Sequence, residues 1–192
     1  MAAKTKKREN PMSVRSKSAL SQALLSLMLQ KDFDEISIQE ITNRAGLSRQ
    51  TFYTNFEKKE DILNYLLNCL FGKYLKQLEA QKITPEYFMI DYLAFWDDSR
   101  DFLTLLFRRG MGYLFQERNR IFFNELPDSI VGVLCPDEQM RPYIKAGLAG
   151  LTYELLYLTM SDGQGLSIDV LTALADNLFT GRIFSTSLYF HF

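Results

Sequence analysis

Apolar side chains recur at three- and four-residue steps along most of the chain, the spacing that places them on one face of an α-helix. Leu20, Leu24 and Met28 form such a face and predict a first helix over about residues 13–31. Strict two-residue alternation is absent, and Val and Ile are sparse, which disfavours a β-sheet. The pattern therefore predicts an all-α protein.

Two short helices are expected next. Ser37 and Glu40, three residues apart, have the spacing of a capping box that begins a helix. Gly46 ends this second helix, and a third is predicted over residues 48–55 with Ser48 as its cap. A tight glycine turn lets two helices meet at a steep angle, which is the geometry of a helix-turn-helix that presents its second helix to a DNA major groove.

The rest of the chain is predicted to be helical as well. A long amphipathic pattern after residue 60 ends before Pro85 and predicts a fourth helix. Further helices are expected over residues 85–97, 100–115, 117–134, 138–160 and 167–186. The predicted architecture is a three-helix DNA-binding domain over residues 1–60 and a larger helical bundle over residues 61–192, about nine helices in all.

Composition agrees with this picture. Of the 192 residues, 47% are hydrophobic and 23% charged, as in a globular protein with a substantial core. Cys69 and Cys135 lack CxxC spacing, which favours a reducing cytoplasm. The most apolar run, residues 146–160, is too short to span a membrane and contains Glu154, so no membrane span is predicted.

Positive charge is concentrated near the N-terminus, although the whole chain has a net charge of −1. Residues 1–60 contain 11 Lys and Arg against 7 Asp and Glu, a net charge of +4, whereas residues 61–192 contain 11 against 16, a net charge of −5. The chain begins with a basic arm that includes Lys4, Lys6, Lys7, Arg8, Arg15 and Lys17. Such an arm is attracted to phosphate or anionic lipid, and a solvated, disordered tail is the alternative interpretation.

The predicted third helix carries side chains suited to reading DNA. Arg49 can bind guanine O6 and N7 through its fork, and Gln50 can pair with adenine N6 and N7. Phe52 and Phe56 are expected to face inward and hold the helix on its scaffold. Lys59, in the first turn of the next helix, is placed for a phosphate. Similar small polar residues occur on any exposed helix. The whole set of residues therefore indicates DNA binding more strongly than any one of them.

Residues from about 19 to 63 closely resemble the DNA-binding domain of the TetR/AcrR family of bacterial transcriptional regulators, through the sequence S-I-Q-E-I-T-N-R-A-G-L-S-R-Q-T-F-Y-T-N-F-E-K-K-E-D-I-L. The resemblance implies DNA contacts, with Tyr53 and Lys59 as phosphate clamps. The implied contact residues are Ser37, Ser48, Arg49, Gln50, Thr51, Tyr53, Thr54, Asn55 and Lys59. Asp32 stands where the family usually has glycine, and is expected to tolerate the left-handed conformation there. Gln50 also replaces a frequent glycine and adds a base-reading side chain.

The family's C-terminal bundle usually holds an inducer, and aromatic residues are dense in this region. Of the 37 residues from 87 to 123, 11 are aromatic, which is about twice the aromatic fraction of 14% in the whole chain. They can line an apolar ligand pocket or form an ordinary core, and the second is commoner at helical spacing. The candidate ligand-binding residues are Tyr92, Trp96, Phe107, Tyr113, Tyr153, Glu154 and Tyr157. Glu154 is expected to pair with Arg108 or Arg109 or to be exposed, and the alternative is a cationic ligand.

The last two predicted helices are candidates for a homodimer interface. Ala146, Gly147 and Gly150 form a surface of small residues on the first of them. The second has an apolar stripe of Ile168, Leu171, Leu174, Ala175, Leu178 and Phe179. Two helices from each subunit can form a four-helix interface around a two-fold axis, and the alternative is that these stripes face their own core.

The leading hypothesis is a cytoplasmic, homodimeric repressor that binds a palindromic operator in double-stranded DNA and responds to an unknown small-molecule effector. An enzyme is disfavoured because the sole His191 lies at the C-terminus and the chain has no glycine-rich phosphate loop and no metal-ligand spacing. No cofactor or metal is expected. A helical adaptor without operator binding is the alternative function.

Overall fold

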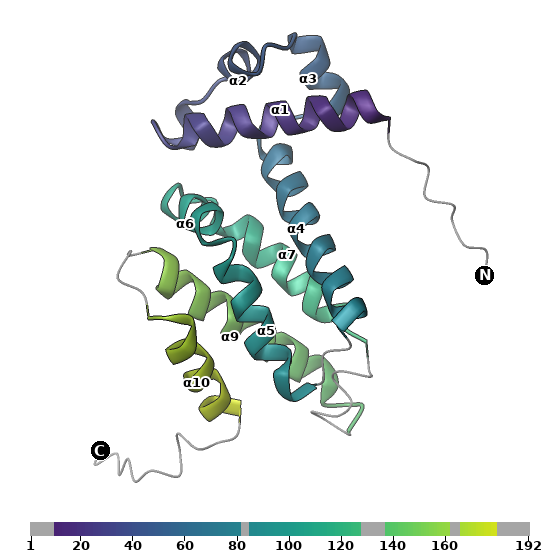
Figure 1. Cartoon of the computed structure of the whole chain (residues 1–192), viewed down its shortest axis with the longest axis vertical. Helices are drawn as coiled ribbons and strands as arrows, with labels where there is room; N and C mark the ends of the chain where they lie inside the picture. Colours follow the sequence, from purple (N-terminus) through teal and green to yellow (C-terminus); the bar gives the residue numbers. More distant parts are fainter. Residues whose placement is uncertain (1–9, 82–84, 128–136, 162–165, 180–192) are drawn as a thin grey trace, which may run out of the picture. The chain divides into compact units, whose positions relative to one another are not determined.

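The computed structural model describes residues 10–81, 85–127, 137–161 and 166–179. These residues form nine α-helices and one short 3-10 helix, and none of them lies in a strand (Figure 1). The prediction of an all-α fold is therefore confirmed. Of the basic arm, Lys4, Lys6, Lys7 and Arg8 lie outside the described residues, as does His191, whereas Arg15 and Lys17 lie in the first helix.

The contacts between Cα atoms divide the chain into two compact units, Met1–Cys69 and Leu70–Phe192. This division falls inside the long helix α4 (Glu60–Gln81), so a single helix contributes to both units. The predicted domain boundary, at the start of that helix, remains a prediction.

The N-terminal unit is a compact helical head. It contains α1 (Pro11–Met28), the 3-10 helix η1 (Phe33–Glu35), α2 (Ile38–Ala45), α3 (Arg49–Asn55) and the start of α4. Helix α1 packs against both α2 and α3 (Figure 1). The buried core of the head includes Leu20, Leu24, Met28, Phe33, Ile36, Ile41, Phe52, Phe56, Ile62 and Leu63.

Polar caps and one glycine define the helix-turn-helix. Ser37 and Glu40 form the predicted capping box at the start of α2. Gly46 has φ 65° and ψ 30°, a left-handed conformation that favours glycine. The amide of Leu47 donates to the carbonyl oxygen of Thr42 at 2.9 Å, which closes the C-terminus of α2. The chain then reverses and begins α3.

The expectation of a left-handed conformation at Asp32 is wrong. Asp32 has φ −68° and ψ 148°, an extended backbone that any residue adopts. Helix α1 has already ended at Met28, and the amides of Gln30 and Lys31 both donate to the carbonyl oxygen of Leu27, at 2.9 and 3.1 Å. A glycine is therefore not required at residue 32.

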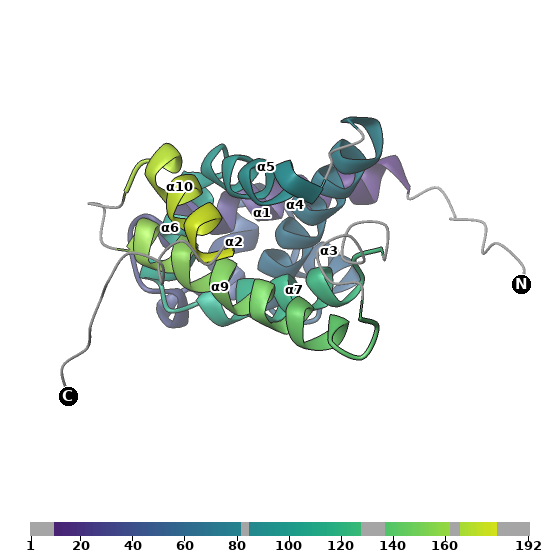
Figure 2. The ribbon, with the colours of Figure 1, turned by 90° about the horizontal axis from the view of Figure 1, so that it is seen from below.

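The C-terminal unit contains the second half of α4 and five further described helices. These are α5 (Pro85–Asp97), α6 (Arg100–Arg108), α7 (Gly112–Asn124), α9 (Arg141–Ser161) and α10 (Ile168–Phe179). Helix α9 packs along α7 and also contacts α6, while α10 packs on α5 (Figure 2).

Three predicted helix boundaries in this unit are wrong. The helix expected over residues 100–115 ends at Arg108, because Gly110 has φ 71° and turns the chain. Helix α7 therefore begins at Gly112, earlier than the predicted start, and ends at Asn124 rather than near residue 134. Apolar residues keep helical spacing across the turn, and this concealed the break.

Candidate nucleic-acid interface

Helix α3 is fixed on the head by its aromatic side and exposes its polar side. Phe52 is fully buried, and its ring centre lies 6.0 Å from that of Phe56, which in turn lies 5.9 Å from that of Tyr65 on α4. The inward orientation expected for the two phenylalanines is confirmed. Because successive residues of a helix point in different directions, this anchoring leaves Arg49 and Gln50 exposed.

Arg49 and Gln50 are the most available hydrogen-bonding side chains of α3. Within the described part of the chain, neither side chain forms a hydrogen bond or an ion pair. Their donors and acceptors therefore face solvent at the N-terminal end of the helix. Tyr53 lies on the same helix with 52% of its surface exposed, and its ring rests edge-on against Phe52 at 5.3 Å.

Three other predicted contact residues already form hydrogen bonds within α3. The amide of Thr51 donates to Ser48 Oγ at 3.1 Å, and the two hydroxyl groups lie 2.9 Å apart. The hydroxyl of Thr54 donates to the carbonyl oxygen of Gln50 at 2.8 Å. These bonds cap and tighten the helix, while the threonine methyl groups remain suited to apolar contacts with thymine.

Asn55 links α3 to the first turn of α1. Its Nδ2 donates to the carbonyl oxygen of Thr51 at 2.8 Å, and its Oδ1 accepts a hydrogen bond from Ser13 Oγ at 2.7 Å. Ser13 could not be identified from the sequence, because no local pattern relates it to a residue 42 positions later. A surface groove of about 340 Å³ lies beside this contact. Its lining residues are Asn10, Met12, Ser13, Ser16, Gln50, Thr51, Thr54 and Asn55.

Ser37 stands at the start of α2 inside a charged capping network. Its amide donates to Glu40 Oε2 at 2.9 Å, and Glu40 Oε1 lies 2.6 Å from Lys31 Nζ. The hydrogen bond from Lys31, followed by those from Ser37, lowers the pKa of Glu40 to about 2. The carboxylate is therefore ionised at neutral pH and holds the end of α1 to the start of α2.

Lys59 is oriented toward the protein rather than away from it. Its Nζ donates to the carbonyl oxygens of Phe33, Ile36 and Asp34, at 2.6, 3.0 and 3.2 Å. No local pattern in the sequence predicts this arrangement, because the partners are main-chain atoms more than twenty positions away. The phosphate contact implied for Lys59 remains a prediction.

Most of the candidate ligand-binding residues pack within the aromatic core of the C-terminal unit. Tyr92 and Trp96 are fully buried, with ring centres 6.2 Å apart. Phe107 lies 6.2 Å from Tyr153 and 5.3 Å from Tyr157, measured between ring centres. Burial raises the pKa of Tyr92, so its hydroxyl stays protonated. These contacts agree with the core interpretation, and a ligand role remains a prediction.

The two other candidates lie at the surface. Tyr113 is 52% exposed, and Glu154 is exposed on α9. Arg108, one of the expected partners of Glu154, donates instead to the carbonyl oxygen of Ser161 at 3.2 Å. Burial, with a smaller contribution from the charge of Glu154, raises the pKa of the neighbouring Tyr153.

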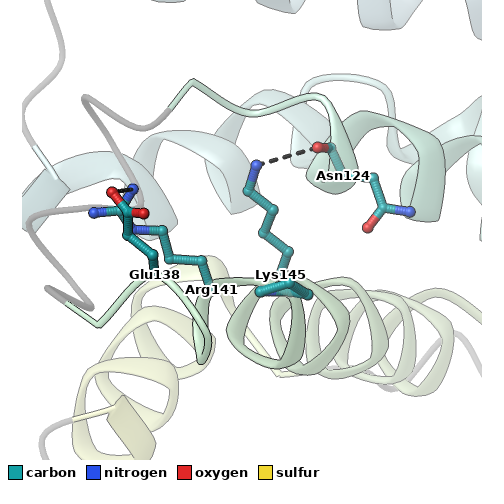
Figure 3. A pocket seen from close by; sticks show the side chains of 5 residues that line it. Asn124, Glu138, Arg141 and Lys145 are labelled. Atoms are coloured by element: carbon teal, nitrogen blue, oxygen red, sulfur yellow. Dashed lines mark hydrogen bonds and ion pairs between the residues drawn. The ribbon is translucent and has the colours of Figure 1, made fainter.

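A polar pocket of about 480 Å³ lies where α7 ends beside α9 (Figure 3). It is lined by Asn124, Glu138, Arg141, Pro142 and Lys145, and none of the candidate ligand-binding residues is among them. Lys145 Nζ donates to the carbonyl oxygens of Asn124 and Leu126, at 3.1 and 2.7 Å, and so caps the C-terminus of α7. The pocket is thus partly explained by a helix cap.

The candidate dimer surface on α9 is accessible. Ala146, Gly147 and Gly150 are all exposed, and a Cβ atom added to either glycine would meet no atom of the described residues within 4 Å. Leu158, on the same helix, is 62% exposed. On α10, Leu171 is buried at 2% exposure, so that part of the predicted stripe faces the core of its own unit.

None of the helices in the described ranges is both long and apolar enough to cross a membrane. The same residues contain no group of three or more His, Cys, Asp or Glu side chains that could hold a metal ion.

Comparisons with known proteins match the N-terminal unit to a family of DNA-binding regulators. Residues 20–66 match the family model of bacterial regulatory proteins, tetR family. A 66-residue stretch, 31% of this chain, is 32% identical to an uncharacterized HTH-type transcriptional regulator, YwcC of Bacillus subtilis (strain 168), and spans only 29% of that protein's length. A TetR transcriptional regulator from Streptococcus agalactiae 2603V has a crystal structure that matches with a TM-score of 0.66 and 21% identity, over 88% of this chain and 95% of that chain. At this identity the structural match shows a shared fold.

Proposed function

We propose, from the premise that this chain belongs to the TetR family of bacterial transcriptional regulators, that it binds a palindromic operator as a homodimer and represses transcription until an effector binds. The family is a non-enzymatic one whose helix-turn-helix domain binds DNA. The operator, the dimer and the effector are proposals. The DNA target places the protein in the cytoplasm.

The exposed, unbonded pair of Arg49 and Gln50 carries the proposal of sequence-specific binding. A side chain that is already hydrogen-bonded within the protein must give up that bond before it can bind a base edge. Arg49 and Gln50 give up only hydrogen bonds to water. Their position at the N-terminal end of α3 is the one from which recognition helices contact bases. Tyr53 then serves a phosphate, and the methyl groups of Thr51 and Thr54 serve thymine methyl groups.

A second copy of the chain supplies the second half-site. One seven-residue recognition helix makes few contacts, and two-fold symmetry doubles them. The exposed small residues of α9 support close packing against another helix, because none of the described residues fills the space above Gly147 and Gly150. Half-sites one helical turn apart, about 34 Å or a multiple of it, are expected for such a dimer.

The effector is proposed to bind among the aromatic residues of the C-terminal unit. Phe107, Tyr153 and Tyr157 support this, because they form an aromatic group in which Tyr157 remains 38% exposed. An effector changes operator affinity only if it binds the two spacings of the recognition helices with different affinities. Helix α4, which contributes to both units, is the proposed connection.

Selection of bound genomic fragments, followed by a gel shift at two salt concentrations, tests this proposal. We expect one or a few palindromic fragments to be retained at high salt, and wild-type protein to shift them as a dimer. The control is Arg49→Ala, which should bind the selected fragments less tightly, with preference lost at one base pair, while keeping weak binding at low salt. Absence of any shift at low salt would reject operator binding and favour the helical adaptor.

A further inference from the structure

Asn55, the last residue of α3, is held by two hydrogen bonds. Its Nδ2 donates to the carbonyl oxygen of Thr51 at 2.8 Å, one turn earlier in the same helix. Its Oδ1 lies 2.7 Å from Ser13 Oγ, in the first turn of α1. Within the described residues, the side chain of Asn55 forms no other hydrogen bond. The bond to Ser13 therefore joins the end of the recognition helix to a separate helix of the head.

The carbonyl group of Thr51 decides which way the amide of Asn55 faces. A carbonyl oxygen only accepts hydrogen bonds, so the amide nitrogen has to face it. The amide oxygen then faces Ser13, whose hydroxyl has to donate. The serine hydroxyl fits this arrangement, whereas an alanine at residue 13 would leave a half-buried oxygen unpaired.

One N–H group of Asn55 remains for a partner outside the protein. Nδ2 carries two N–H groups, and among the described residues only Thr51 uses one of them. Asn55 lines the groove of about 340 Å³ beside α1, and it also lines a second surface hollow of about 490 Å³ together with Tyr53. The remaining N–H group thus belongs to a residue that borders the same surface as a predicted phosphate ligand. Side-chain amides are among the donors that proteins use to bind DNA phosphates.

We propose that Ser13 is a positioning residue of the DNA interface, which orients the amide of Asn55 so that its second N–H group donates to a DNA phosphate. This inference rests on the proposed DNA-binding function, and it assigns the contact of Asn55 to one atom and one kind of partner. Without the Ser13 hydroxyl, a single hydrogen bond holds the amide, which then occupies other rotamers. Helix α1 thereby contributes to DNA binding through a residue of α3.

Operator binding by two serine variants tests the proposal. Ser13→Ala removes the donor to Asn55. The matched control is Ser16→Ala, because Ser16 lies one turn further along α1, is also half-buried and lines the same groove. The hydroxyl of Ser16 forms no hydrogen bond in the part of the chain that the structure describes. Circular dichroism first shows that each variant is folded at the assay temperature.

We expect Ser13→Ala to weaken operator binding about tenfold, because each subunit of the dimer loses one oriented donor. Ser16→Ala should bind like the wild type. Neither variant changes a charge, so the slope of log affinity against log salt should keep its wild-type value. Wild-type affinity of Ser13→Ala, an equal loss in Ser16→Ala, or a changed slope would each overturn the proposal.

A double-mutant cycle shows whether Ser13 acts through Asn55. Asn55→Ala removes the proposed phosphate donor, so the addition of Ser13→Ala to this variant should weaken binding no further. A further loss as large as that of Ser13→Ala alone would give Ser13 an independent role and would contradict the proposal.

Nuclear magnetic resonance of the DNA-free protein measures the bond itself. The side-chain N–H signals of Asn55 are identified by their absence from the spectrum of Asn55→Ala. We expect these signals to shift in Ser13→Ala and to keep their wild-type positions in Ser16→Ala. Unchanged signals in Ser13→Ala would overturn the inference. Because no DNA is present, this result decides the link between α1 and α3 even if the wild-type protein binds no operator, an outcome that would reject the proposed function.

Discussion

The polar side chains of α3 differ in how much of their hydrogen-bonding capacity remains for a partner. Ser48 and Thr54 use theirs to hold the helix, whereas Arg49 and Gln50 use none within the described residues. Similar polar residues in one short helix can therefore have different functions. Specificity is expected to depend on the two long side chains, and rigidity on the two short ones.

Single substitutions at the two unbonded residues should change base preference. Arg49→Ala and Gln50→Ala are each expected to remove discrimination at one base pair, worth about 1–3 kcal/mol, because each removes one two-pronged contact. Competition binding against operators altered one base pair at a time measures this. Thr54→Val, which keeps the shape of a side chain bonded within its own helix, serves as the control and should keep the wild-type preference. An equal loss of affinity for every sequence would contradict the prediction.

The lowered pKa of Glu40 predicts a specific dependence of stability on pH. An acid whose pKa falls from 4.5 to about 2 on folding stabilises the protein above pH 4.5, and this contribution is lost as the pH falls toward 2. Glu40→Gln keeps the capping acceptor but cannot ionise. The thermal midpoint of the wild type should therefore exceed that of Glu40→Gln at pH 7, and the difference should shrink below pH 4.5. A difference that does not vary with pH would refute the assignment.

The sequence predicted those helix ends that depend on a capping residue or a glycine turn. It did not predict the contacts between residues far apart in the chain. Ser37, Gly46 and Ser48 each act on atoms within a few residues, so their roles follow from spacing alone. Ser13 and Lys59 act on segments that folding brings close, and no local pattern encodes such contacts. The all-α fold and the position of α3 were thus available from the sequence, whereas the bonds that orient α3 and α2 required the structure.

The turn between α2 and α3 should be sensitive to a single added methyl group. Gly46→Ala would meet no atom of the described residues within 4 Å, so its expected cost of about 1 kcal/mol arises from the left-handed backbone. Gly72→Ala is the control, because that glycine lies within α4 and also has open space around it. It is expected to stabilise the protein by up to about 1 kcal/mol. Urea unfolding curves measure both, and a stabilised Gly46→Ala would contradict the argument.

A buried amide joins three helices of the C-terminal unit. Asn119 on α7 accepts from the hydroxyl of Tyr92 on α5, and its Nδ2 donates to Ala149 O at 2.8 Å and Thr152 Oγ1 at 3.0 Å on α9. Asn119→Leu should destabilise the protein by about 1–3 kcal/mol, because it leaves buried polar groups unpaired.

Chemical unfolding measures the effect of Asn119→Leu. Thr159→Val is the matched control. Within the described residues, the buried hydroxyl of Thr159 bonds only to the carbonyl oxygen of Leu155 on its own helix, so its loss should cost less. Equal stability losses in the two variants would show that the links between helices add nothing.

For the whole molecule, the proposed function requires that events in one unit reach the other. The boundary between the two compact units falls within the continuous helix α4. This helix contains one glycine, Gly72, and no proline. A continuous helix transmits a displacement over its length, whereas a flexible linker does not. The proposed effector response therefore depends on the integrity of α4 and on the association of two chains.

Charge placed on the exposed surface of α9 should separate the proposed dimer. Leu158→Lys replaces a side chain that is 62% exposed, so the fold of the monomer should persist while close packing of a second copy becomes unfavourable. Sedimentation equilibrium should show a monomer, and operator affinity should fall. Leu29→Lys, at a residue 71% exposed in the N-terminal unit, is the control and should remain dimeric. A dimeric Leu158→Lys would exclude this surface as the interface.

The contact between Ser13 and Asn55 bears on attempts to redirect such a protein to new genes. Exchanging only the seven residues of α3 for those of another regulator would leave Ser13 facing a side chain that no longer accepts its hydrogen bond. The transplanted helix would then sit at a different angle from the one that suited its original target. We expect a successful exchange to replace residue 13 together with α3, with both taken from the same regulator.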